Sequence, residues 1–291
     1  MPPSARVRVP ASTSNLGPGF DCLGLALGLH NDVRVEPAGA TEPPASPFLA
    51  DVAQAFFAGS GLKPFPFRAK IEGDVPQARG LGSSVTVRLG VLMGLNRLCG
   101  NPLDRNQLFQ RSAELEGHPD NAAAACFGGF SVVRKRGREP AEVLRYDVDP
   151  ALKVVLCVPD FEIQTTAARK VLPTHYPRED VLTNLTNTAA IVAAFTSRDY
   201  GLLRGAFTDR IHQPYRQHLV PFLPDVIAAG TAAGALGGFL SGSGSTIACM
   251  TLHQEQEVAR AMLAAVPGQA AVTRVICVDN AGAKWLDESD E

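Results

Sequence analysis

The chain has 291 residues, of which 45% are hydrophobic and 19% are charged. This length gives an expectation of about two domains, or one large one, and is sufficient for a sizeable hydrophobic core. The modest charge excludes disorder caused by excess charge. Lys and Arg number 27 against 29 Asp and Glu, a formal net charge of −2, which argues against a nucleic-acid partner bound through phosphate neutralisation.

Targeting and membrane signals are not found in the sequence. The first ten residues carry Arg6 and Arg8 without an apolar segment behind them, so no signal peptide is predicted. No apolar stretch reaches the roughly 18 residues that span a bilayer, so we expect no membrane partner and predict a cytoplasmic location. The dispersed cysteines form no CxxC pair and are interpreted as reduced core residues: Cys22, Cys99, Cys126, Cys157, Cys249 and Cys277.

The first half of the chain mixes strand and helix patterns. Apolar alternation and apolar runs predict strands near residues 7–9, 23–29, 33–35 and 67–71. Helical spacing predicts helices near residues 49–57 and 83–98. Asp104, with Gln107 three residues on, has the capping-box pattern of a further helix that ends near Gly117, and Pro119 starts a short Ala-rich helix that ends at Gly128.

The second half begins with strands near residues 130–133, 143–146 and 153–158, followed by mostly helical sequence over 165–224. For the remaining C-terminal sequence we predict a glycine-rich turn over 237–244, a strand over 246–250, a helix over 254–266 and a strand over 272–278. Near residues 149–151 the predicted pattern changes from mixed strands and helices to mostly helix after one further strand, which suggests two domains, residues 1–150 and 151–291. Mixed order without regular βαβ alternation indicates an α+β fold.

The sharpest chemical signal is the phosphate loop, residues 76–84, which ends in Arg-Gly-Leu-Gly-Ser-Ser between a predicted strand and a predicted helix. Its glycines let backbone N–H groups converge on an anion, and the helix start adds positive partial charge. A Walker A loop has Lys after its last glycine, where this chain has Ser83. The alternative is an ordinary glycine turn with Ser83 as the helix N-cap.

The acidic junction, residues 114–121, combines carboxylate, imidazole and carboxamide side chains between two predicted helices. Glu116 offers a hard oxygen ligand for Mg²⁺. In the alternative interpretation Glu116 is a solvated last-turn residue, His118 lies on the surface and Asp120 caps a helix.

Two further segments are rich in small or turn-forming residues. The serine-glycine turn, residues 240–246, lets a ligand or another backbone approach closely, or is only a flexible connection. The N-terminal turn, residues 15–21, is bracketed by Asn15 and Asp21, which can also make only local backbone hydrogen bonds.

Together and in this order, these segments resemble the GHMP kinases (galactokinase, homoserine, mevalonate and phosphomevalonate kinases). The resemblance covers nearly the whole chain, with the family's three motifs at residues 10–21, 76–84 and 234–246. Segments 116–121, 168–173 and 213–216 are similar to those of its homoserine branch. The chain departs from the family at residues 85–88, Val-Thr-Val-Arg in place of a run of Ala, and at Ser245, where Pro is common.

The resemblance implies an α+β fold with an N-terminal domain like ribosomal protein S5 and a ferredoxin-like C-terminal domain, with the site in the cleft. It implies ATP and Mg²⁺ as cofactors, the metal being held by Ser84 and Glu116. Residues implied in ATP binding are Pro76, Ala78, Arg79, Gly80, Leu81, Gly82, Ser83 and Ser84. The third glycine motif contributes Gly242, Ser243 and Gly244.

L-Homoserine is the substrate that the resemblance implies. Its amino and hydroxyl ends would be held by Asn15, Asp21, His118, Asp120 and Asn121. Its carboxylate would be bound by Arg169 and Arg216. The implied catalytic residues are Asp120, Asn121, Ser84 and Glu116, with Asp120 either a general base or a positioning group.

Other interpretations remain open at this point. They are a GHMP kinase for mevalonate or a sugar, a non-catalytic small-molecule sensor on the same fold, and an S5-like RNA-binding module. The paired arginines favour a zwitterionic substrate, a sensor would be expected to lack Ser84 or Glu116, and an RNA binder would be basic. A homodimer is the candidate assembly.

Overall fold

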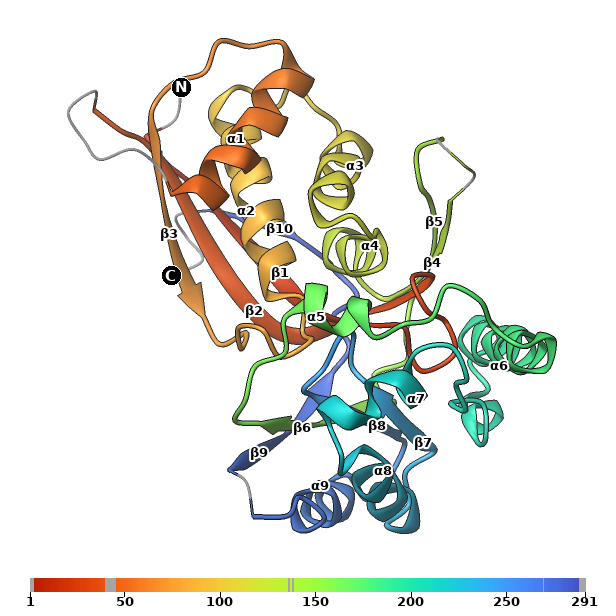
Figure 1. The fold of residues 1–291 in the computed structure, drawn as a ribbon. Coiled ribbons are helices and arrows are strands. Elements are labelled where there is room, and N and C mark those ends of the chain that lie inside the picture. Colours follow the sequence, from red (N-terminus) through yellow and green to blue (C-terminus); the bar gives the residue numbers. More distant parts are fainter. Residues whose placement is uncertain (1–2, 40–45, 136, 138, 269, 288–291) are drawn as a thin grey trace.

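The computed structural model describes residues 3–39, 46–135, 137, 139–268 and 270–287. Its strands form two sheets, each with helices packed on one face, which confirms the α+β class (Figure 1). A shared core joins the sheets, since buried residues of both, among them Leu25, Phe130, Leu156 and Phe239, belong to one hydrophobic cluster. The functional motifs lie on the loops and helix ends between the two sheets.

The first sheet has six strands in the order β10-β1-β2-β4-β5, with β3 also paired to β2. Its strands are β1 (Ala5–Ser14), β2 (Leu23–Pro37), β3 (Phe67–Gly73), β4 (Phe130–Arg134), β5 (Glu142–Tyr146) and β10 (Lys284–Leu286). The helices beside it are α1 (Pro47–Ser60), α2 (Ser83–Leu98), α3 (Arg105–Glu116) and α4 (Asp120–Phe127). Asp104 and Gln107 form the predicted capping box at the start of α3.

Helix α2 lies close to β2 because two of its residues have no side chain. At Gly90 and Gly94, one turn apart, a Cβ atom would stand 2.5 Å and 2.4 Å from side-chain atoms of Val33 and Val35. Larger residues would push the helix off the strand. The close packing fixes the position of the N-terminus of α2, where the phosphate loop ends.

The second sheet has four strands in the order β7-β8-β6-β9. These are β6 (Lys153–Pro159), β7 (Gly237–Leu240), β8 (Ile247–Thr251) and β9 (Ala271–Cys277). Helices α8 (Leu223–Ala232) and α9 (Glu255–Ala264) pack on it. Between β6 and α8 lie α5 (Thr165–Lys170), α6 (Arg178–Ser197), the 3₁₀ turn η1 (Tyr200–Leu203), α7 (Gln213–Arg216) and η2 (Gln217–Leu219).

The structure corrects three predicted elements. The strands expected at 23–29 and 33–35 are the single 15-residue strand β2. Its polar centre is satisfied by neighbours, because Asn31 donates to Thr86 Oγ1 at 2.8 Å and Asp32 pairs with Arg8. The turn expected at 237–244 begins as strand β7, whose glycines pair with β8.

The structure also contains a strand, β10 (Lys284–Leu286), that was not predicted. The short β10 pairs with β1, so the last described segment lies in the first sheet (Figure 1). The predicted boundary near 149–151 falls between β5 and β6, and the division into residues 1–150 and 151–291 stays a prediction.

The six cysteines are free, but only Cys126, Cys157 and Cys249 are buried. Cys277 is exposed at the end of β9, so its interpretation as a core residue was wrong. Over the described residues, no helix is both long and apolar enough to cross a membrane.

Candidate active site

The phosphate loop ends at an uncapped helix N-terminus. Gly82, not Ser83, is the N-cap of α2, in a left-handed conformation with φ +68°, and no side chain bonds to this helix end among the described residues. A Cβ atom on Gly82 would stand 2.3 Å from Ser12 Oγ, which requires glycine here. The first-turn N–H groups and the positive end of the helix dipole are therefore available to an anion.

The phosphate loop is joined to the serine-glycine turn. Ser241 Oγ donates to Gly80 O at 2.7 Å, and a Cβ atom on Gly80 would lie 2.1 Å from Ser241 O. Arg79 turns away from the cavity, because its Nε donates to Pro159 O at 3.0 Å and its Nη2 lies 3.3 Å from Asp160. The loop thus presents backbone, and no cationic side chain, to the cavity.

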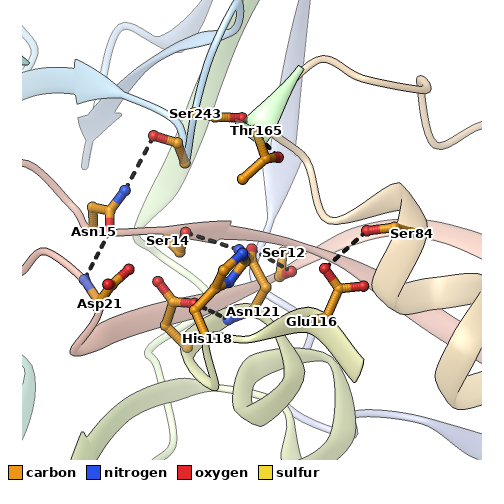
Figure 2. A network of polar contacts seen from close by, with 12 residues as sticks. Ser12, Ser14, Asn15, Asp21, Ser84, Glu116, His118, Asn121, Thr165 and Ser243 are labelled. Carbon is orange, nitrogen blue, oxygen red and sulfur yellow. Dashed lines mark hydrogen bonds and ion pairs between the residues drawn. The ribbon is translucent and has the colours of Figure 1, made fainter. Parts of the chain in front are cut away.

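Two amide side chains link the motifs: Asn121 joins the acidic junction to strand β1, and Asn15 joins the N-terminal turn to the serine-glycine turn. Asn121 accepts from Ser12 Oγ at 2.9 Å and donates to Ser14 Oγ at 3.0 Å (Figure 2). Asn15 donates to Gly242 O at 3.1 Å and accepts from the backbone N–H of Asp21 at 3.0 Å. Both ends of each amide have a protein partner, so these predicted substrate-binding residues tie the motifs together.

The predicted metal ligands are brought together at the other side of the cavity. Ser84 Oγ donates to Glu116 Oε2 at 3.1 Å (Figure 2). The other oxygen of Glu116 forms an ion pair with Arg88, one of the residues 85–88 at which the chain departs from the family's run of alanines. The Glu116 side chain is only 8% exposed, so the interpretation as a solvated last-turn residue was wrong.

Between these two groups lie His118 and Asp120. Asp120 is buried at the start of α4; its Oδ1 accepts from the Asn121 N–H at 2.8 Å and lies 3.3 Å from His118 Nδ1. Burial acts to lower the pKa of His118, but the hydrogen bond and charge of Asp120 outweigh it, and the pKa is raised. The neighbouring Asp120 therefore favours the protonated form of His118.

Two guanidinium groups flank Phe20 at the far end of the cavity. Arg169 donates to Asp21 at 3.0 Å and 2.6 Å. Arg216 is 2% exposed and donates to Ala168 O and Gly242 O, each at 3.0 Å. Both guanidinium carbons lie 5.3 Å from the Phe20 ring centroid.

Arg216 has no carboxylate partner within ion-pair distance among the described residues. Burial, with the nearby charge of Arg169 adding to it, lowers the pKa of Arg216 to about 10. Its Nη1 lies 3.2 Å from Nδ1 of the buried His212, whose Nε2 lies 2.8 Å from Gly17 O. A buried cation without a carboxylate is stabilised by an incoming anion.

A cavity of about 110 Å³ is lined by residues from each of these motifs. The predicted residues that line it are Asn15, Asp21, Ala78, Gly80, Gly82, Ser83, Ser84, Glu116, His118, Asp120, Asn121, Arg169, Arg216, Gly242 and Ser243. Pro76, Arg79, Leu81 and Gly244 do not line it; Pro76 and Arg79 border a separate hollow, and Leu81 is buried in the core.

Sequence reasoning missed several contributors. Ser12 and Ser14 lay within a recognised motif but carried no assigned role, and Phe20 gave no chemical signal. His212 directly precedes the recognised segment 213–216. Its position near Arg216 in the sequence was the only sign that it could belong to the site. Thr165, which lines the cavity opposite Glu116 (Figure 2), follows no pattern in the sequence.

Comparisons with known proteins agree with this geometry. The models of the GHMP kinases N-terminal and C-terminal domains match residues 48–129 and 191–268. A homoserine kinase of Moorella thermoacetica is 38% identical over 271 residues, covering 89% of this chain and 91% of that protein. One of Deinococcus radiodurans is 41% identical over 257 residues, covering 84% and 83%.

A solved structure supports the same relationship. The crystal structure of homoserine kinase from Cytophaga hutchinsonii has a TM-score of 0.88 at 26% identity and covers 98% of both chains. The chain therefore belongs to the GHMP kinase superfamily and, within it, to the homoserine kinases, which are ATP-dependent phosphotransferases.

Proposed function

We propose that this chain transfers the terminal phosphoryl group of ATP, with Mg²⁺, to the side-chain hydroxyl of L-homoserine, giving O-phospho-L-homoserine for threonine biosynthesis. The observation that carries the substrate assignment is the buried Arg216, a cation with no carboxylate partner among the described residues, beside the Asp21–Arg169 ion pair. This end of the cavity offers positive and negative groups together, which suits an amino acid.

The carboxylate of homoserine is proposed to lie against Arg216 and Arg169. Guanidinium groups bind carboxylates through paired N–H donors, and these two are already oriented by backbone carbonyls, Asp21 and the Phe20 face. When Arg169 turns to the substrate, Asp21 becomes free to accept from the substrate ammonium. Each of these charges, including that of the buried Arg216, then has an opposite partner.

The phosphate groups of ATP are proposed to lie at the N-terminus of α2. Gly80, Gly82, Ser83 and Ser84 supply backbone N–H groups, and the helix dipole favours negative charge there. Arg79, predicted to bind ATP, is engaged with Pro159 and Asp160 and would contribute through its backbone alone.

Ser84 and Glu116 fit a magnesium ion. Their oxygens are hard donors 3.1 Å apart at the end of the phosphate site, and Mg²⁺ is commonly held by one or two carboxylates plus substrate phosphates and water. Consistent with so few protein ligands, the described part of the chain has no cluster of three or more His, Cys, Asp or Glu residues that would form a metal cage. When bound, the ion would neutralise charge on the transferred phosphoryl group.

Asp120 is proposed to position the substrate hydroxyl. One of its oxygens already accepts from the Asn121 N–H and faces His118, which fixes the direction of the carboxylate. Phosphoryl transfer commonly has a loose transition state in which the attacking oxygen has formed little bond, so early proton removal contributes little. Correct orientation of the hydroxyl contributes more.

The experiment is an assay of ADP release from the purified chain with ATP and Mg²⁺, over L-homoserine, L-threonine, mevalonate and galactose. We expect L-homoserine to be much the best acceptor. Background rates with homoserine, together with acceleration by mevalonate or galactose, would assign another GHMP kinase activity. If none of the four compounds raises ADP release above background, the result would favour a non-catalytic small-molecule sensor. The homodimer and the cytoplasmic location stay predictions.

A further inference from the structure

Arg88 lies next to the predicted metal ligands but contacts neither of the proposed substrate sites. It follows Ser84 by one turn of α2, so both side chains leave the same face of the helix. Glu116, the last residue of α3, reaches between them. One carboxylate oxygen accepts from Ser84 at 3.1 Å and the other is paired with Arg88.

The ion pair is partly withdrawn from water. The side chains of Arg88 and Glu116 are 20% and 8% exposed. The guanidinium carbon of Arg88 lies 4.9 Å from the ring centroid of Phe48, at the start of α1, which covers the cation on another side. Shielded charges interact more strongly than those on an open surface, so this pair is not a loose surface contact.

The charge balance has a consequence for a cation. Among the carboxylates that line the cavity, Glu116 is the one bonded to Ser84, and Arg88 compensates its charge. With that charge compensated, the Ser84–Glu116 site attracts a divalent cation weakly until nucleotide phosphates add negative charge beside it.

We propose that Arg88 is a positioning residue that acts through Glu116 and makes metal binding at the Ser84–Glu116 site depend on bound nucleotide. The proposal rests on the metal site of the proposed function. Arg88 leaves Glu116 Oε2 facing Ser84 and suppresses metal binding by the nucleotide-free protein, so the metal binds together with ATP.

The test measures the affinity of the full chain for Mn²⁺, with and without a non-hydrolysable ATP analogue. The electron paramagnetic resonance signal of the free ion gives the concentration of unbound Mn²⁺. Arg88→Met removes the charge but keeps an apolar stem against Phe48, and should tighten nucleotide-free Mn²⁺ binding by about tenfold. Arg88→Lys, which keeps the charge, should bind as the wild type does. The matched control is Arg97→Met, which removes the same charge from the same helix at a residue stacked over Trp285.

The outcomes separate this inference from the metal assignment. Adding Glu116→Gln to Arg88→Met should abolish the gain in affinity. If the gain persists without Glu116, or if Arg97→Met gives the same gain, the effect is one of general charge and the proposal is wrong. If Arg88→Met and a second neutral variant, Arg88→Gln, fold and bind no tighter than wild type, Arg88 has only a structural role. If Glu116→Gln leaves Mn²⁺ binding in the presence of the analogue unchanged, the metal site itself is misplaced and the proposal fails with it.

Discussion

Arg169 and Asp21 are joined by two hydrogen bonds, of 3.0 Å and 2.6 Å, although 148 positions separate them in the chain. The pair sets a cation and an anion side by side, next to the buried Arg216. A zwitterionic substrate can exchange partners with such a pair, its carboxylate taking the guanidinium and its ammonium taking the carboxylate. No buried charge is then left alone.

The first prediction concerns the two arginines. Arg169→Lys should raise the KM for homoserine by about tenfold or more and leave the KM for ATP nearly unchanged, because an ammonium cannot reproduce paired N–H bonds. Arg216→Lys should do the same and also lower the free energy of unfolding by about 1–3 kcal/mol, since buried carbonyls lose donors. Steady-state kinetics and urea unfolding measure both effects. An equal rise in both KM values would indicate misfolding of the site.

Glu116→Gln should lower kcat by orders of magnitude while nucleotide binding without metal changes little, because the change keeps the shape of the side chain and removes its charge. Kinetics over a range of Mg²⁺ concentrations test this. The matched control is Glu114→Gln on the same helix, whose carboxylate is exposed and pairs with Arg111 at 2.9 Å. Near-normal turnover of Glu116→Gln at limiting Mg²⁺ would contradict the assignment.

The phosphate loop should not tolerate a side chain at Gly80. Gly80→Ala combines a φ of +73° with a Cβ atom 2.1 Å from Ser241 O, and should abolish most activity as well as destabilise the fold. Gly100→Ala is the control, since φ is +81° but no atom lies within 4 Å. It should cost only about 1 kcal/mol and leave kcat unchanged. Equal effects of the two changes would show that the contact with the serine-glycine turn is unimportant.

His212 should make stability depend on pH. Burial lowers its pKa to about 4, with the Arg216 charge acting in the same direction and the nearby Asp209 opposing it. As the pH falls, His212 is protonated near pH 6.5 in the unfolded chain but only near pH 4 in the native state. The free energy of unfolding should therefore fall as the pH decreases through this window, by up to about 1.4 kcal/mol per unit.

Urea unfolding from pH 7 to 4 measures this dependence, and His212→Gln is the comparison. The variant should be less stable at pH 7 but should have a shallower slope. Parallel slopes for the two proteins would show that His212 is not held neutral in the native state.

Asp120→Asn should mainly raise the KM for homoserine, with a smaller loss of kcat, if Asp120 orients the hydroxyl. The measurement is the pH–rate profile of both proteins at saturating homoserine. A fall in kcat of about three decades or more, with loss of the acidic limb, would make Asp120 the general base instead.

Local signals in the sequence predicted the elements well, and long-range pairing explains the errors. Helix α2 begins and ends as predicted because Gly82 and Gly100 bracket it, and α3 carries its capping box in the sequence. Strand β10 was missed because its three residues, Lys284–Leu286, become a strand only by pairing with β1.

The site shows the same division. Most residues that line the cavity were predicted because their motifs are contiguous, but their partners are distant in the chain. Nothing in the sequence says that Asn121 bonds Ser12 and Ser14, or that Arg88 pairs with Glu116. These contacts depend on how helices and strands pack, so only the structure shows which polar atoms remain available to a ligand.

Binding of a zwitterionic substrate is tested by comparing L-homoserine with two acceptors that each lack one charged group. 4-Hydroxybutanoate lacks the ammonium and 3-aminopropan-1-ol lacks the carboxylate, while both keep the reacting hydroxyl. Because the missing group would leave Asp21 or Arg216 without its partner, we predict that kcat/KM falls by about 100-fold or more for each. If 3-aminopropan-1-ol were phosphorylated as efficiently as L-homoserine, the account of Arg169 and Arg216 as the carboxylate site would be contradicted.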